Sequence, residues 1–419
     1  MTLHRNQLAM LAAAIERVAV LDVPADGALY QFFRAHGEMG VRDRALVADG
    51  AFAYLRRKRS LEAIAQSTLP RHLALAVAVR DFDFSVRELT PAINASDAEW
   101  LAAFKSRVHE PLPPAVAADV PDWLWDRLGD VYGDDARAAI ARSWQVPAPL
   151  DLRANVMKAS RDEALAALAA EGLAVVATPY APNGIRIDGR PSMAAHPWVV
   201  DGRLEVQDEG SQLIGVLVAP RRNDMVVDFC AGAGGKTLLL GAMMRSQGRL
   251  YAFDVAARRL QNMTPRLARS GLSNVHPQVI AHERDAKVKR LFGKIDRVLV
   301  DAPCTGFGTL RRNPDLKWRQ TPQDLAELTA KQTRILDAAS MLVKPGGRVV
   351  YATCSVLPEE NDAIVDAFLR THPAAFAERD VAPLLAQAGV ALDTGPRLRL
   401  LPHLHGCDGF FAAVLERNP

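Results

Sequence analysis

Residues 226–237 read VVDFCAGAGGKT, and this stretch decides the fold class. Its first residues are apolar and β-branched, as in a buried strand, and its last residues begin a helix-forming run. The glycines between them allow the backbone to turn tightly and to approach a ligand closely. A helix that begins directly after such a turn presents free amide groups to an anion. The stretch therefore predicts a strand, a ligand-binding turn and a helix.

Three ligand classes fit this turn: a dinucleotide, a nucleoside triphosphate, and the aminoacyl carboxylate of S-adenosylmethionine. The end of the stretch matches the P-loop pattern G-x-x-x-x-G-K-[ST], but Cys230 replaces the opening glycine. The pattern G-x-G-x-x-G fails because Thr237 stands at its third glycine. Asp254 ends the next expected strand, where an acid can accept hydrogen bonds from ribose hydroxyls. This favours an adenosine-bearing cofactor, while a P-loop NTPase and a structural turn without a ligand stay open.

The surrounding sequence divides into three regions. Residues 1–146 carry apolar residues at three- and four-residue spacing, which predicts a helical domain. Residues 150–205 mix short strands with one helix at 161–171, capped by Ser160, and predict a small α+β domain. Residues 206–419 alternate apolar strands with helices, which predicts an α/β domain with a parallel sheet. We expect strands of that sheet at 225–229, 249–253, 297–300 and 348–351.

Two cysteines follow strands of this expected sheet. Cys304 ends the turn DAPC after 297–300, and Cys354 lies in the turn ATCS after 348–351. Ligands of open α/β sheets bind at the carboxyl ends of the strands, so both thiols are expected at one cleft if the strands are neighbours. A thiolate beside a methyl donor can activate a poorly nucleophilic ring carbon by adding to its neighbour. Buried structural cysteines and a disulfide are the alternatives.

Composition excludes several protein classes. The chain has 419 residues with 51 basic and 48 acidic side chains, a net charge of +3. Its apolar runs are shorter than the roughly 18–20 residues that span a bilayer, so no membrane association is expected. The four cysteines are widely separated and form no CxxC pair, which argues against a disulfide framework or a zinc site. We expect a reduced, cytoplasmic protein without a metal.

The glycine turn, the two cysteine turns and several other stretches resemble those of a known family, the bacterial RsmB (Sun/Fmu) ribosomal RNA cytosine-C5 methyltransferases. The matching stretches are 207–212, 228–237, 254–260, 301–304, 311–318, 351–361 and 406–411. The resemblance implies a Rossmann-like class I methyltransferase sheet, preceded by a helical NusB-like RNA-binding domain and a small RRM-like extension. It also implies methyl transfer from S-adenosylmethionine to carbon 5 of a cytosine in 16S ribosomal RNA, by a protein expected to be a monomer.

The resemblance assigns roles to single residues. Cys354 would be the nucleophile, Cys304 would assist product release, and Asp301 would also contact the base. The residues that would hold S-adenosylmethionine are Cys230, Ala231, Gly232, Ala233, Gly234, Gly235, Lys236, Asp254, Arg259, Asp285 and Asp301. Transfer RNA is an alternative substrate, and a non-catalytic RNA-binding assembly factor is an alternative function.

One basic loop is a further candidate for RNA contact. Arg311, Arg312, Lys317 and Arg319 surround Trp318 shortly after the Cys304 turn. Cations for phosphates together with an aromatic ring for stacking suit single-stranded RNA. We therefore expect this loop to face the substrate beside the active site.

Overall fold

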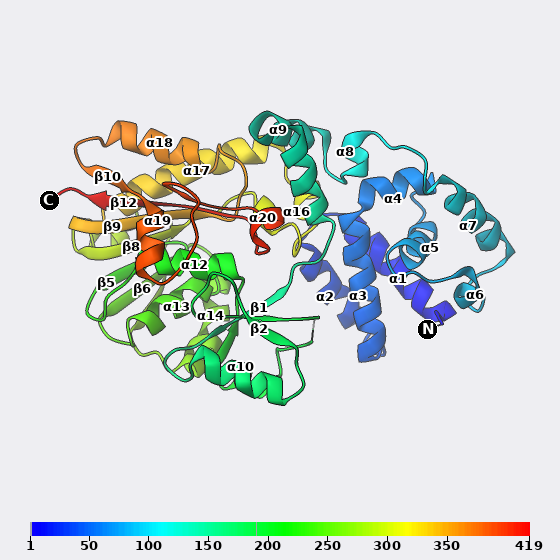
Figure 1. The fold of residues 1–419 in the computed structure, drawn as a ribbon, viewed down its shortest axis with the longest axis horizontal. Helices are drawn as coiled ribbons and strands as arrows, with labels where there is room; N and C mark the ends of the chain where they lie inside the picture. Colours follow the sequence, from blue (N-terminus) through cyan, green and yellow to red (C-terminus); the bar gives the residue numbers. More distant parts are fainter. Residues whose placement is uncertain (1, 190) are drawn as a thin grey trace. The chain divides into compact units, whose positions relative to one another are not determined.

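The protein divides into two compact units in the computed structural model, which describes residues 2–189 and 191–419 (Figure 1). The first unit contains Met1–Pro147 together with Thr309–Pro322. The second contains Ala148–Gly308 and Gln323–Pro419. A short segment far along the chain thus belongs to the N-terminal unit, which the sequence did not indicate.

The first unit is helical. Leu8, Leu11 and Ile15 lie on one face of its first helix and are fully buried, as their spacing predicts. They form a single core with the apolar residues of the third and fifth helices. The helices of this unit are α1 (Arg5–Ala19), α2 (Ala25–Ala35), α3 (Val41–Arg56), α4 (Lys58–Ala65), α5 (Pro70–Arg80), α6 (Val86–Leu89), α7 (Ala95–Arg107), α8 (Pro114–Ala117), α9 (Asp122–Trp144) and α16 (Leu316–Arg319).

The basic loop expected to face RNA is packed into this helical unit, and the prediction is wrong for three of its residues. The Nζ of Lys317 donates to the carbonyl of Arg56 at 2.8 Å, and Nε1 of Trp318 donates to the carbonyl of Leu55 at 2.7 Å. Arg311 and Lys317 are buried. The physical reason is the C-terminus of α3, whose last carbonyls lack partners within the helix and accept these donors instead.

The second unit contains a small sheet in the order β2-β3-β1-β4, with antiparallel pairs throughout. Apolar residues of this sheet and of α10 form its core. Ser160 accepts a hydrogen bond from the amide of Glu163, which confirms the predicted helix start. The elements are β1 (Leu150–Ala154), α10 (Arg161–Ala170), β2 (Val175–Ala177), β3 (Gly184–Ile187), α11 (Pro197–Val200) and β4 (Leu204–Val206).

The large sheet of the second unit has the order β10-β12-β9-β8-β5-β6-β7, with β11 paired to β12. The five strands from β9 to β7 are parallel, as predicted, and β12 runs antiparallel to β9. The order reverses between β5 and β8, which creates a topological switch point. The strands are β5 (Met225–Asp228), β6 (Arg249–Asp254), β7 (Val275–Val279), β8 (Ile295–Asp301), β9 (Val343–Thr353), β10 (Phe376–Arg379), β11 (Leu398–Leu400) and β12 (Phe410–Arg417).

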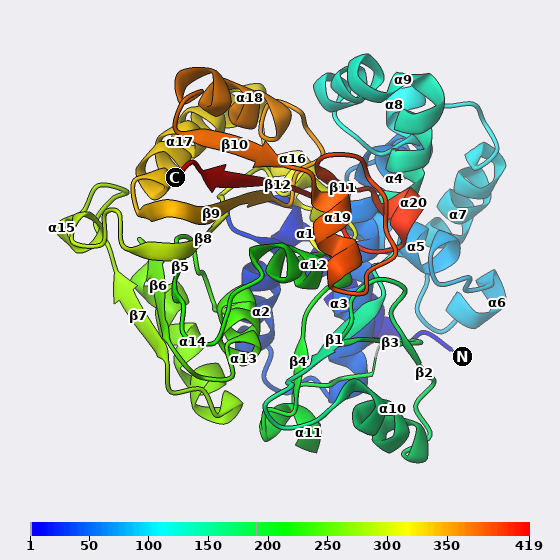
Figure 2. The same cartoon turned by 60° about the vertical axis from the view of Figure 1, so that its left-hand side comes forward.

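Helices cover both faces of the large sheet (Figure 2). One hydrophobic core joins one face to α12, α13, α14 and α19, and a second core joins the other face to α15, α17 and α18. Within the described residues, no helix is both long and apolar enough to cross a membrane. The helices are α12 (Glu209–Val218), α13 (Gly235–Met243), α14 (Ala257–Ser270), α15 (Ala286–Lys289), α17 (Pro322–Ser340), α18 (Asp362–Thr371), α19 (Val381–Gln387) and α20 (Pro402–His405), with the 3-10 turn η1 (Phe307–Thr309).

Candidate active site

A cavity of about 740 Å³ opens at the carboxyl ends of β5, β6, β8 and β9. Ligands of open α/β sheets bind at this place, where the strand order reverses, and the size suits a small-molecule cofactor. Its wall contains most of the residues expected from the sequence, namely Cys230, Ala231, Gly232, Ala233, Gly235, Lys236, Asp254, Arg259, Asp301, Cys304 and Cys354.

The glycine turn adopts the backbone geometry that its sequence predicts. Gly232 and Gly234 have φ angles of 55° and 86°, in the left-handed region that favours glycine. Gly234 lies at the N-cap of α13 and is not on the cavity wall. A Cβ atom at this position would lie 2.5 Å from the side chain of Met263. The turn therefore leaves the first amides of α13 facing the ligand site, where an anionic group is stabilised.

Asp254 is held firmly at the end of β6. Its Oδ2 accepts a hydrogen bond from the amide of Gly232 at 2.8 Å, and its Oδ1 accepts one from the amide of Ala256 at 2.7 Å. A carboxylate oxygen can accept more than one hydrogen bond, so both oxygens keep capacity for a ligand. The geometry suits the two hydroxyls of a ribose.

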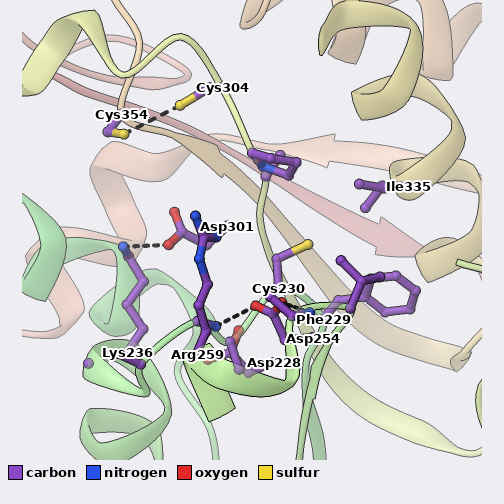
Figure 3. A pocket seen from close by; sticks show the side chains of 18 of the residues that line it. Asp228, Phe229, Cys230, Lys236, Asp254, Arg259, Asp301, Cys304, Ile335 and Cys354 are labelled. Carbon is purple, nitrogen blue, oxygen red and sulfur yellow. Dashed lines mark hydrogen bonds and ion pairs between the residues drawn. The ribbon is translucent and has the colours of Figure 1, made fainter. Parts of the chain in front are cut away.

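The two strand-end cysteines come together. Asp301 pairs with Ala352 across the parallel strands β8 and β9, so the turns that follow leave the sheet side by side. The Sγ atoms of Cys304 and Cys354 lie 3.3 Å apart, and both cysteines are free thiols (Figure 3). The amide of Gly308 also donates to the carbonyl of Cys354 at 2.8 Å, which joins the two turns through the backbone.

A lysine from the glycine turn lies beside these thiols. The Nζ of Lys236 donates to Oδ2 of Asp301 at 2.8 Å (Figure 3). Burial opposes the positive charge of Lys236, but the charge and hydrogen bond of Asp301 and the charge of Cys354 outweigh it and raise the pKa of Lys236. The Lys236 ammonium thus stays a cation that interacts electrostatically with Cys354.

Cys304 is held in its protonated form. The hydrogen bond with Cys354 raises the pKa of the Cys304 thiol well above its ordinary value, and burial and the charges of Cys354 and Glu360 add to this effect. Within the pair, Cys304 is therefore the sulfur that keeps its proton.

Three carboxylates surround the glycine turn. Burial raises the pKa of Cys230 well above its ordinary value, and the charges of Asp228, Asp301 and Asp254 raise it further. These acidic side chains disfavour a triphosphate at the turn and stabilise a ligand that carries a positive charge. The charge pattern therefore fits the sulfonium of S-adenosylmethionine better than the P-loop alternative.

Several residues of the cavity wall were not predicted. Arg266 donates from Nη1 to the carbonyl of Ala233 at 2.8 Å and from Nη2 to Glu205 at 2.8 Å, so it supports the glycine turn from α14. No local motif marks this arginine, because its position depends on how α14 packs. The other unpredicted residues of the wall include Gln207, Ser211, Glu283, Lys331 and Ile335.

The structure does not bring Asp285 to the cavity wall. Its carboxylate caps α15, accepting from the amide of Lys287 at 2.8 Å, and also accepts from the amide of Ala281 at 2.8 Å. Glu283, two residues earlier, lies on the wall instead. The local turn decides which of these neighbouring acids faces the ligand.

Known protein families match this chain in sequence, and one relative is similar over its whole length. Residues 215–416 match the family model of 16S rRNA methyltransferase RsmB/F, and residues 120–194 match that of an RsmF/B-like ferredoxin-like domain. A ribosomal RNA small subunit methyltransferase B of Sodalis glossinidius is 32% identical, over 100% of this chain and 99% of the relative. The chain belongs to the RsmB/F family of 16S rRNA methyltransferases.

Other relatives of this RsmB/F-family chain match over shorter stretches. A probable ribosomal RNA small subunit methyltransferase B of Bacillus subtilis is 33% identical over 71% of this chain, and the match spans 66% of that relative, just under two thirds of its length. The crystal structure of a methyltransferase homologue from Pyrococcus horikoshii superposes with a TM-score of 0.63 at 28% identity, covering 73% of this chain and 98% of the other. These matches confirm the methyltransferase fold.

Proposed function

We propose that this chain transfers a methyl group from S-adenosylmethionine to carbon 5 of a cytosine in 16S ribosomal RNA, through a covalent bond between Cys354 and carbon 6 of the base. One observation carries the proposal. Two thiols from neighbouring strand ends lie 3.3 Å apart on the wall of a cavity that also contains the glycine turn and Lys236. Methylation of a ring nitrogen or a ribose oxygen has no use for such a pair.

The residues of the cavity fit the proposed cofactor. Asp254 would accept hydrogen bonds from the ribose hydroxyls, and the first amides of α13 would receive the aminoacyl carboxylate. Asp301, and Asp228 in its ionised form at a pH above about 7, would stabilise the positively charged sulfonium. When bound, S-adenosylmethionine supplies an electrophilic methyl group at the edge of the sheet where the thiols lie.

Each side chain at the thiol end has a definite task. The Cys354 thiolate, stabilised by the Lys236 cation, adds to carbon 6 of the cytosine, and the ring electrons move to carbon 5, which takes the methyl group. The proton on carbon 5 is then taken by Cys304, after it has lost its own proton, or by a water molecule; the ring double bond re-forms, and Cys354 leaves as a thiolate. Cys304 is the side chain placed to assist this release.

Asp301 has a second role in this scheme. Its Oδ2 is occupied by Lys236, and its Oδ1 is left to accept a hydrogen bond from the exocyclic amino group of cytosine. Uracil carries a carbonyl oxygen at that position, which a carboxylate repels. The pair Lys236–Asp301 thus joins activation of the thiol to selection of the base.

The test measures the methylated nucleoside and cofactor binding in the same protein. We expect 5-methylcytidine by nucleoside mass spectrometry after incubation of the wild type with unmodified 16S rRNA and S-adenosylmethionine. Cys354→Ala should yield no product yet bind S-adenosylhomocysteine within about twofold of the wild type by calorimetry, because the sulfur contributes to chemistry rather than to cofactor binding. Full activity of this variant would refute the covalent role, and methylation of tRNA instead of 16S rRNA would refute the substrate.

A further inference from the structure

Glu360 is a buried carboxyl group that the proposed reaction does not use. It lies between β9 and α18, six residues after Cys354, and its exposed fraction is 0%. Burying a carboxylate costs free energy unless hydrogen bonds replace its water shell. The residues that donate hydrogen bonds to its carboxylate are Thr305 and Gln332, and both contact the turn of Cys304.

The first set of partners holds the turn of Cys304. Oε1 of Glu360 accepts from the amide of Thr305 at 2.8 Å, and Oε2 accepts from the Thr305 hydroxyl at 2.5 Å. The Nε2 of Gln332 donates both to Oε1 of Glu360 at 3.0 Å and to the carbonyl of Pro303 at 2.9 Å. The residues before and after Cys304 are thus both anchored through this carboxylate.

The second set of partners holds the turn of Cys354. The hydroxyl of Ser355, the residue that follows Cys354, lies 3.3 Å from the hydroxyl of Thr305, which itself donates to Oε2 of Glu360 at 2.5 Å. The backbone carbonyl of Glu360 accepts from the hydroxyl of Tyr351 at 2.7 Å, which fixes its position relative to β9. The carboxylate therefore binds the residue after Cys304 directly and is linked to the residue after Cys354 through the Thr305 hydroxyl.

We propose that Glu360 is a positioning residue for the two thiols: its carboxylate clamps the turn of Cys304 against the turn of Cys354 and so sets the separation of the sulfurs. The inference rests on the proposed function, because it explains how the pair of thiols is held at reacting distance. Glu360 touches neither the base nor the cofactor in this account and acts through the two turns alone.

The charge of Glu360 adds an electrostatic consequence. The groups that face Cys304 are Cys354, Glu360 and Tyr351, while the Lys236 cation lies toward Cys354. Burial raises the pKa of Glu360, and its hydrogen bonds oppose this shift. Oε1 of Glu360 receives two N–H donors, so a proton on this carboxyl group lies on Oε2. When ionised, Glu360 places a negative charge near Cys304 and favours the thiol form of that cysteine.

Glu360→Gln tests the charge with little change of shape. In this variant, the side-chain oxygen can still accept from the Thr305 amide and from Gln332. The side-chain nitrogen can donate to the Thr305 hydroxyl, which then accepts a hydrogen bond instead of donating one. We measure the pH dependence of iodoacetamide alkylation at each cysteine by peptide mass spectrometry, with Glu327→Gln, an exposed site on α17, as the control. In Glu360→Gln, but not in Glu327→Gln, the pH at the midpoint of Cys304 alkylation should fall by about half a unit. Below the midpoint, this corresponds to a roughly threefold faster reaction.

Glu360→Asp tests the clamp itself. The shorter side chain keeps the charge but cannot reach both turns. Diamide, an azo oxidant, takes two electrons and two protons from a pair of thiols to form a disulfide, so its rate measures how close the sulfurs are. We expect formation of the Cys304–Cys354 disulfide to slow at least about tenfold in Glu360→Asp and to stay near the wild-type rate in Glu360→Gln.

Neither measurement needs RNA or the methyl donor, so failure of this inference is distinguishable from failure of the proposed function. An unchanged Cys304 midpoint in Glu360→Gln would overturn the electrostatic role. An unchanged disulfide rate in Glu360→Asp would overturn the positioning role. If Glu360→Gln does not fold, Thr305→Val removes one donor of the clamp and must slow the disulfide reaction, and a wild-type rate in that variant would count against the inference.

Discussion

Cys304 and Cys354 are chemically unequal although their sulfurs lie 3.3 Å apart. The Lys236 cation lies toward Cys354, whereas the hydrogen bond with Cys354, burial and the Glu360 charge hold the proton on Cys304. Two identical thiols in one environment would share their charge equally and could not divide attack from release. The inequality comes from neighbouring groups, Lys236 and Glu360, which belong to different segments of the chain.

Asp228 gives a pH-dependent prediction at the same scale. Burial raises its pKa from 3.8 to about 7, the Thr237 hydroxyl hydrogen-bonded at 2.7 Å opposes the shift, and the charge of Asp301 adds to it. The folded form therefore binds the proton more tightly than the unfolded chain, so stability is highest at low pH and falls as the pH rises through about 7.

Asp228→Asn should remove this pH dependence. Between pH 5 and pH 8 the wild type should lose roughly 2–3 kcal/mol of unfolding free energy relative to the variant, because ionisation of the buried carboxyl is no longer required in the variant. Urea titrations of both proteins at the two pH values measure the difference. Equal pH profiles would show that Asp228 is ionised throughout this range.

The elements that build the site do so through strand register. Val300 and Asp301 of β8 pair with Tyr351 and Ala352 of β9, so the loops after both strands begin at the same level. The η1 turn then approaches the start of β12, where the amide of Gly409 donates to the carbonyl of Gly308 at 2.8 Å. A shift of register by one residue would turn the strand residues to the opposite face and separate the sulfurs.

Gly308→Ala should disrupt this approach. A Cβ atom at position 308 would lie 2.0 Å from the carbonyl oxygen of Gly409 and 2.8 Å from that of Cys354. We expect a loss of about 1–3 kcal/mol in unfolding free energy and at least a tenfold loss of methylation, since the Cys354 turn must move. Gly27→Ala is the control: its Cβ meets nothing within 4 Å, and alanine in α2 should stabilise the protein. A Gly308→Ala protein with wild-type stability and activity would contradict the close approach.

Several elements were predictable from sequence, and the reasons for the others are physical. Strands β5, β6, β8 and β9 are buried on both faces and read as apolar runs, so their ends at Cys304 and Cys354 could be placed. β7 has the sequence VHPQV and is mostly exposed, so it contains no apolar run from which a strand could be predicted. The position of Glu283 rather than Asp285 at the cavity, and the clamp formed by Glu360, depend on turns and packing that no local pattern encodes.

At the scale of the whole molecule, the second unit is interrupted by a segment that belongs to the helical first unit. Thr309–Pro322 follows the Cys304 turn and η1, and it is part of the first unit. A basic segment ordinarily indicates an exposed surface, but Lys317 is buried here, and its Nζ donates to the carbonyl of Arg56 at the end of α3. Burial lowers the pKa of Lys317 to about 7 against the opposing charge of Asp119. The helical unit and this segment therefore fold as one body.

Limited trypsin digestion should reveal this packing. We expect cleavage after Lys317 to be at least about tenfold slower than cleavage after Lys289, which is exposed, because a protease needs a mobile backbone. Trp318→Ala removes the indole that donates to Leu55 and should accelerate cleavage after Lys317 while leaving the rate at Lys289 unchanged. Equal cleavage at both sites of the wild type would show that the segment is not part of the helical unit.

The most direct measurement for the covalent mechanism traps the protein on its RNA. Cys304→Ala, incubated with 16S rRNA and S-adenosylmethionine, is separated on a denaturing gel, and the attachment site is mapped by tandem mass spectrometry. We expect a slowly migrating RNA–protein adduct joined through Cys354, which disappears in the Cys304→Ala/Cys354→Ala double variant. An adduct through any other residue, or methylated RNA without any adduct, would contradict it.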